Sequence, residues 1–262
     1  EVVTADVDST EIKEEQMDLR FKVALNEVLG RYPKLAEDIR KSLHTPQMGE
    51  HHQEGPRMDS HLKLILENLR RIVAQDFPDQ LDSVPGIKKI LAEVVMAGSV
   101  AGKENIVLSP RLVDYAFLHD LEKPNSMSLK LEGRKDKPEI TWEQWQEIEK
   151  RGEPYVYVDK DGNETAITGI AYMQASLGKE GTHGFKAAQK IREVAPEVPK
   201  LIAEAINKHE VAYQFSRVNA ATYEEHFVKP GFSEEEQRFI LTASYIDTMS
   251  SLKRGEDGQL RP

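Results

Sequence analysis

The segment from residue 112 to residue 124 constrains this chain more than any other, because it is apolar and yet carries two ionisable side chains side by side. The apolar residues that predict a buried helix here are Tyr115, Ala116, Phe117, Leu118 and Leu121. His119 and Asp120 lie within the same segment, and a buried imidazole or carboxylate is costly unless something pairs with it. A metal ion can pair with both groups, since it binds neutral imidazole nitrogen and carboxylate oxygen together. Pro124 is expected to end the helix, so the pair would lie at a helix end that opens onto a loop.

The composition is that of an ordinary soluble protein with enough length for a sizeable core. The chain has 262 residues, of which 39% are hydrophobic and 31% are charged, so wholesale disorder is not expected. Its formal net charge of −10 argues against a general nucleic-acid or anionic-membrane binder, because both partners favour a basic face. The net charge does not exclude small phosphorylated substrates, since two bound metal ions would make a pocket locally positive.

The chain contains no cysteine, which excludes disulfide scaffolds, thiolate zinc sites and cysteine nucleophiles. Any metal must therefore be held by His, Asp and Glu side chains, which suit Fe, Mn, Ni, Co, Zn or Mg. No apolar run approaches the ~18 residues that a membrane-spanning helix needs, and no signal peptide is visible. We expect a cytoplasmic protein.

Helical periodicity dominates the sequence and predicts an all-α fold with one small β-hairpin. The predicted helices cover residues 11–32, 33–43, 61–73, 87–96, 110–120, 141–150, 183–194, 199–215 and 233–252. The hairpin is predicted over residues 155–168, because aromatic and β-branched residues flank Asp161-Gly162. Its acidic turn superficially resembles a calcium loop, but it lacks the later ligands and the flanking helices.

The domain organisation follows from the positions of these elements. We expect an N-terminal helical extension in residues 1–45, a metal-binding domain in residues 46–255 and a polar tail in residues 256–262. The character of the chain changes after Pro124, where it becomes polar and rich in lysine. Residues 125–170 are therefore interpreted as an insertion that lies over the metal site.

Four further residues are candidates for the same site. His61 opens a helix and His183 lies near a helix N-terminus, positions where a capping or surface residue is the usual explanation. His209 shares a helical stripe with apolar residues and so points inward, where a core histidine with satisfied hydrogen bonds is the usual explanation. Asp247 lies on the inner face of the last helix, and a carboxylate there needs a partner.

The motifs around these residues resemble those of the HD-domain superfamily of metal-dependent phosphohydrolases. The matching stretches are Glu54-Gly55 before His61, His119-Asp120 before Lys123-Pro124, His183-Gly184 with the alanines that follow, Asn207-Lys208-His209-Glu210, and Asp247 within residues 244–249. The resemblance covers most of the chain, from Gln53 to Asp247. It implies an HD-domain helical bundle for residues 46–255.

The resemblance also implies a dinuclear site. Its six ligands would be His61, His119, Asp120, His183, His209 and Asp247. Asp120 would bridge the two ions, with His61, His119 and Asp247 around one ion and His183 and His209 around the other. Two departures from the family pattern stand out. The gaps before His119 and before His183 are longer than usual, and Leu121-Glu122 replaces the usual small residue, so that Glu122 could project a charge toward the pocket.

The implied activity is hydrolysis of a phosphate ester, by a phosphomonoesterase or phosphodiesterase that uses two divalent metal ions to activate water. Asp120 and Lys123 are the predicted catalytic residues. Lys123 could also clamp a substrate phosphate, although a solvated lysine at a helix C-terminus explains it equally well. Weaker candidates for binding substrate charge are Arg57, Lys186 and Arg217. We expect a small phosphorylated or nucleotide-like substrate, with no membrane partner and no general nucleic-acid partner; the oligomeric state stays open.

Two alternatives use the same residues. Some HD-domain proteins with this ligand set are mixed-valence di-iron oxygenases, such as the inositol oxygenase and phosphonate-cleaving branches, and four His with two Asp do not separate these from hydrolases. The second alternative is a non-catalytic regulatory or binding protein with a structural metal site. The presence of all six ligands argues against it, because decayed sites lose several.

Overall fold

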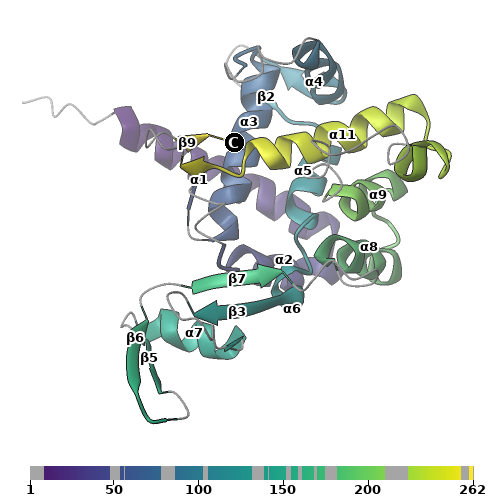
Figure 1. The fold of residues 1–262 in the computed structure, drawn as a ribbon. Helices are drawn as coiled ribbons and strands as arrows, with labels where there is room; N and C mark the ends of the chain where they lie inside the picture. The colour runs from purple at the N-terminus through teal and green to yellow at the C-terminus, as the bar shows by residue number, and fades with distance from the viewer. Residues whose placement is uncertain are drawn as a thin grey trace, which may run out of the picture.

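The structure, a computed structural model, describes residues 9–47, 54–55, 57–77, 86–102, 106–131, 139–140, 142–151, 155–158, 161–167, 170–174, 182–209, 224–254 and 260–261. Most of these residues are helical (Figure 1). The helices are α1 (Ser9–Arg31), α2 (Ala36–Leu43), α3 (Met58–Val73), α4 (Ile87–Met96), α5 (Pro110–Leu118), α6 (Lys123–Ser126), α7 (Trp142–Arg151), α8 (His183–Val194), α9 (Lys200–Lys208) and α11 (Glu234–Met249), with a 3-10 turn η1 (Pro33–Leu35) and a π-helical turn η4 (Glu224–Val228). The predicted all-α character is confirmed.

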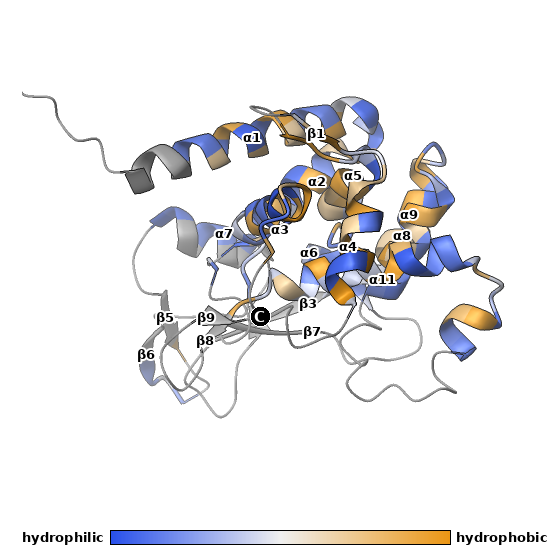
Figure 2. Ribbon diagram, turned by 90° about the horizontal axis from the view of Figure 1, so that it is seen from above, coloured by the Kyte–Doolittle hydropathy of each residue, from blue (hydrophilic) through white to orange (hydrophobic). Residues whose placement is uncertain are grey.

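Helix α5 lies at the centre of the helical body. Every residue from Leu112 to Leu118 is buried, and α5 packs against α1, α3, α9 and α11. Figure 2 shows α5 as largely hydrophobic among its neighbours. A helix that is apolar on all sides is stable only when other helices surround it, because each buried large side chain contributes roughly 1.5–3 kcal/mol.

One buried carboxylate of α5 ties this helix to α1. The Arg31 guanidinium donates two hydrogen bonds to Asp114 Oδ1, at 3.0 and 2.6 Å. The Tyr32 hydroxyl donates to Asp114 Oδ2 at 2.8 Å. Asp114 is 4% exposed, so these bonds compensate the cost of burying its charge.

The predicted hairpin is confirmed. Strand β5 (Tyr155–Val158) pairs antiparallel with β6 (Glu164–Ile167), with Tyr155 opposite Ile167 and Val158 opposite Glu164. Gly162, in the turn, has φ 81°, a left-handed conformation that glycine adopts without strain.

The insertion contains more β-structure than the sequence predicted. Strand β3 (Met127–Leu131) lies between β4 (Glu139–Ile140) and β7 (Ile170–Gln174) in an antiparallel three-stranded sheet. In Figure 1 this sheet, α7 and the hairpin extend together from the helical body next to α6. Residues 175–181, which connect β7 to α8, lie outside the described residues, so the placement of the insertion over the metal site stays a prediction.

Three local features differ from the sequence prediction. The helix predicted over residues 110–120 is α5, which ends at Leu118. Pro124, the residue expected to end it, instead lies in the first turn of α6, where its missing N–H costs nothing. Between the helices predicted over residues 87–96 and 110–120, strand β1 (Val100–Ala101) pairs with β2 (Ile106–Val107). Near the C-terminus, β8 (Lys253–Arg254) pairs with β9 (Leu260–Arg261).

Helix α9 ends at Lys208, and residues 210–215 of the longer helix predicted there lie outside the described residues. None of the described helices combines the length and the apolar character that crossing a bilayer requires.

Candidate metal centre

The structure brings all six predicted ligands together in the interior. His61 lies in the first turn of α3, His119 and Asp120 directly after α5, His183 at the start of α8, His209 directly after α9, and Asp247 in the last turn of α11. All six are buried. They form two groups that could each hold a metal ion, His61 with His119 and Asp247, and Asp120 with His183 and His209.

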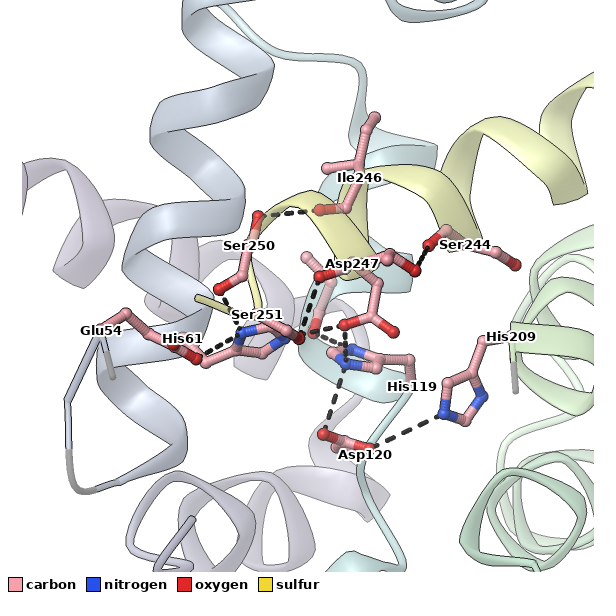
Figure 3. Close-up of polar contacts among 12 residues, drawn as sticks. Glu54, His61, His119, Asp120, His209, Ser244, Ile246, Asp247, Ser250 and Ser251 are labelled. Atoms are coloured by element: carbon pink, nitrogen blue, oxygen red, sulfur yellow. Dashed lines mark hydrogen bonds and ion pairs between the residues drawn. The ribbon is translucent and has the colours of Figure 1, made fainter. Parts of the chain in front are cut away.

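The first group is centred on Asp247. Its Oδ1 lies 2.8 Å from His61 Nε2 and 3.5 Å from His119 Nε2. The two imidazole rings come from different helices, and their centroids are 5.9 Å apart (Figure 3). Both nitrogens therefore converge on one carboxylate oxygen.

The second group pairs two histidines with the other carboxylate. His183 Nε2 lies 2.7 Å from Asp120 Oδ1 and 3.0 Å from His209 Nε2. His209 Nε2 lies 3.9 Å from the same Asp120 oxygen. Two imidazole nitrogens and one carboxylate oxygen thus face a common point.

Asp120 joins the two groups. Its Oδ1 faces His183 and His209, whereas its Oδ2 lies 3.4 Å from His119 Nε2 in the first group. One carboxylate therefore offers one oxygen to each group. This is the arrangement of a carboxylate that bridges two metal ions.

Backbone carbonyl groups orient three of the histidine rings. The Nδ1 atoms lie 3.0 Å from Ser250 O for His61, 2.8 Å from Ala116 O for His119 and 2.6 Å from Ile206 O for His209. A carbonyl oxygen can only accept, so each Nδ1 carries a proton and donates it. When these three rings are neutral, their Nε2 lone pairs are left to bind a metal, as in known metal sites where the second nitrogen is held by an outer partner.

The distances within the groups fit ligand atoms around an ion. With metal–ligand bonds of about 2.1 Å, neighbouring ligand atoms lie about 3.0 Å apart in an octahedral site and about 3.4 Å apart in a tetrahedral one. The observed separations within the two groups run from 2.7 to 3.9 Å. Within the described part of the chain, the buried His119 Nε2 has no hydrogen-bond partner, which is unusual for a buried polar atom. A metal ion would supply the missing partner.

The surroundings keep both carboxylates ionised. Burial raises the pKa of Asp120, but the positive charge of Lys123 and the neighbouring His119 outweigh this and hold that pKa well below its ordinary value. Burial likewise raises the pKa of Asp247, and His119 and His61 hold it well below its ordinary value. Ionised carboxylates are the form that a metal binds.

The histidines respond in opposite directions. Burial lowers the pKa of His61, but hydrogen bonds and charges from Asp247 and Glu54 outweigh burial and raise it to about 9. Burial and the neighbouring His183 lower the pKa of His209. In the metal-free protein, His61 therefore keeps a second ring proton, and the positive charge of the ring partly neutralises the carboxylates beside it. A bound metal ion would take over that role.

Lys123 belongs to the buried part of the site rather than to the surface. Its Nζ lies 3.0 Å from Asp120 Oδ2 and 3.5 Å from Gln47 Oε1, and its side chain is 8% exposed. A solvated lysine at a helix end is therefore excluded. Glu122, the predicted source of a charge in the pocket, is instead bound by Lys190 at 2.8 Å and by the Asn125 amide at 2.9 Å.

The other predicted substrate-binding residues are partly placed. Arg57 is the residue before α3, four residues from His61, and Lys186 lies in the first turn of α8, three residues from His183. Both are half-buried. Arg217 lies outside the described residues.

Sequence reasoning missed Glu54 as a site residue. Its carboxylate lies 3.1 Å from His61 Nδ1 and accepts a hydrogen bond from the Leu252 amide at 2.9 Å. Only 3% of its side chain is exposed. The signal was present in Glu54-Gly55, since a carboxylate in a glycine-containing turn close before a ligand histidine can reach back to the ring.

A glycine allows α8 and α9 to approach closely at the site. A Cβ atom on Gly184 would lie 2.6 Å from His209 Cε1 and 2.7 Å from both His209 Nδ1 and Ile206 O. Any side chain here would displace the His209 ring or its backbone partner. Gly184 is therefore required by the position of His209.

Comparison with known proteins adds no assignment. No protein-family model matches the chain, and neither a curated protein nor a solved structure is significantly similar to it. The resemblance to the HD-domain superfamily stays a prediction that rests on the residues themselves.

Proposed function

We propose that this protein is a metal-dependent phosphohydrolase of the HD type, acting on a small phosphate ester. The observation that supports this most strongly is the meeting of two buried His/Asp groups at Asp120. A single structural ion would need only one such group, and a structural site has all its positions filled by protein. Two adjoining groups that share a carboxylate suit chemistry that needs two ions.

The six ligands would hold two divalent ions, drawn from Fe, Mn, Ni, Co, Zn or Mg. Bound there, the ions would supply Lewis acidity and a water of lowered pKa. Asp120 would position both halves of the site through its two oxygens. Lys123 would hold Asp120 ionised and oriented through the 3.0 Å contact between Nζ and Oδ2.

The balance of buried charge favours an anionic substrate. Three carboxylates, Asp120, Asp247 and Glu54, and one ammonium, Lys123, give the protein part a net charge of −2. Two divalent ions would change this to +2, an attraction that is strong where water is excluded. Arg57 and Lys186, close to the ligand histidines in sequence, are the proposed contacts for further substrate charge, with Arg217 as a third candidate.

A substrate panel tests the proposal. Metal-free protein would be reloaded with Mn²⁺, Fe²⁺ or Zn²⁺ and assayed for phosphate or alcohol release from phosphomonoesters and phosphodiesters, with oxygen uptake recorded in parallel. Asp120→Asn should abolish turnover by removing the bridging charge. Lys123→Ala should raise KM more than it lowers kcat if the ammonium contacts phosphate, whereas Lys34→Ala, at an exposed lysine of η1, should change neither.

The di-iron oxygenase alternative gives a different result. It predicts selectivity for iron, oxygen consumption with substrate and no need for added Mn²⁺. If the protein binds iron, consumes oxygen and releases neither phosphate nor alcohol from any ester, the hydrolase proposal is wrong.

A further inference from the structure

We propose a second ligand site in this protein, a cavity that binds a small carboxylate with an apolar body. The cavity has a volume of about 520 Å³ and lies between α4, α5, α9 and α11. This volume is within the range of pockets that hold small organic ligands. The proposal does not depend on the hydrolase assignment.

The cavity is separate from the metal-binding groups. It is lined by Arg111 at the start of α5, Leu201 at the start of α9 and Glu235 at the start of α11. The ligands His119, His209 and Asp247 lie at the other ends of the same three helices. With a rise of 1.5 Å per residue, about 12–18 Å of helix separates the two places.

One end of the cavity suits a carboxylate. Ser109 is the N-cap residue of α5, but its side chain makes no capping hydrogen bond, and within the described ranges its hydroxyl has no other partner although the residue is only 3% exposed. Arg111, two residues later, forms no ion pair with any residue that the structure describes. The uncapped N-terminus of α5 carries partial positive charge. Pro110 has no N–H, and the Leu112 N–H donates to Ser109 O at 3.1 Å. This leaves the Arg111 N–H as the donor of this first turn. The Ser109 hydroxyl, the exposed guanidinium of Arg111 and this helix end, all lining one cavity, make a set of donors for an anion.

The rest of the cavity suits an apolar body. Val94 and Ala97 of α4, Leu201 of α9 and Phe239 of α11 line it. Burying apolar ligand surface against such side chains is favourable by roughly 25 cal/mol per Å².

The acidic residues that line the cavity do not form ion pairs with Arg111, so its guanidinium can bind a ligand. Arg238 binds Glu93 at 3.1 Å and Glu234 at 2.6 Å, and Lys89 Nζ lies 3.9 Å from Glu93, so two cations offset these two carboxylates. Glu235 is exposed and has no cation partner in the described part of the chain. Its charge would oppose an anion, so its removal should strengthen binding of a carboxylate.

A matched pair of probes tests the site. 4-Phenylbutyrate and 4-phenylbutylamine share an apolar body and differ in the sign of their charge. Calorimetric titration of the full-length chain, both metal-free and metal-loaded, should give saturable one-to-one binding of the carboxylate and binding of the amine that is at least about tenfold weaker.

Variants locate the binding. Arg111→Glu and Ser109→Ala should weaken carboxylate binding, the first by about tenfold or more, and Glu235→Gln should strengthen it. Arg40→Glu, at an exposed arginine of α2, changes net charge equally and should leave binding unchanged. Circular dichroism identifies any variant that fails to fold. If Arg111→Glu fails to fold, the site is tested by carboxylate binding to Ser109→Ala.

The site is refuted if the wild-type chain does not bind the carboxylate, if the amine binds as tightly, or if Arg111→Glu and Ser109→Ala bind like wild type. Any of these results leaves the hydrolase proposal untouched, because that proposal rests on turnover and metal content.

Discussion

Substitution of Gly184 by alanine is a sharp test of the site geometry. The added Cβ would lie 2.6 Å from His209 Cε1, and an ordinary contact begins near 3.4 Å, so the His209 ring must move by about 0.8 Å. Metal–ligand distances tolerate only about 0.2 Å. The movement therefore exceeds the tolerance severalfold and should remove His209 from the second metal-binding group.

The expected cost is about 100-fold or more in affinity for one of the two ions, at least as large as the loss on mutating outer partners of metal-binding histidines. This corresponds to about 2.7 kcal/mol. Overpacking between α8 and α9 should also lower the free energy of unfolding by roughly 1–3 kcal/mol, reduced by the better helix propensity of alanine.

Isothermal titration with Mn²⁺ and urea unfolding measure the two effects. Gly30→Ala is the matched control, because a Cβ at Gly30 in α1 meets nothing within 4 Å. It should keep two metal sites and gain up to about 1 kcal/mol of stability. If Gly184→Ala binds two ions with wild-type affinity, then either His209 is not a ligand or α8 and α9 can move apart enough to accept the added methyl group.

Two further predictions concern stability. Asp114→Ala should lower the free energy of unfolding by about 2–3 kcal/mol, because the buried Tyr32 hydroxyl and the partly exposed Arg31 both lose the Asp114 carboxylate. Asp114→Asn should cost less. Urea unfolding measures both effects, and equal effects would contradict this explanation. For the metal-free protein, the pKa of His61 is raised from 6.5 to about 9, so the folded state binds the extra proton and its stability should fall as pH rises from about 6.5 through 9. Unfolding curves across this range should show that slope in the wild type, and its persistence in His61→Gln would assign it to another group.

Local patterns predict that two of the ligands point inward, whereas His61 and His183 are chosen from the resemblance to the HD-domain superfamily. His209 follows a stripe of buried apolar residues, which fixed its direction inward, and Asp247 lies on the buried face of α11. Burial of such groups without partners is costly, so the need for partners could be read from the sequence.

The parts that could not be predicted depend on contacts between distant segments. Pro124 lies inside α6 and not at the end of α5, and proline rules alone do not give that position or the contact of His119 Nδ1 with Ala116 O. Ser109 occupies the N-cap position that the sequence predicts, but its side chain does not cap the helix. Glu54 reaches both His61 and Leu252, and the second partner is 198 residues away in sequence.

The most direct test of the central claim is the number of metal ions per chain. Protein reloaded with Mn²⁺ under nitrogen, freed of excess metal and measured by elemental analysis should contain two ions per chain. Asp120→Ala and His119→Ala should show large losses, the first affecting both groups because Asp120 offers an oxygen to each. A wild-type chain with no bound metal, or an Asp120→Ala chain that keeps two ions, would contradict the shared dinuclear site.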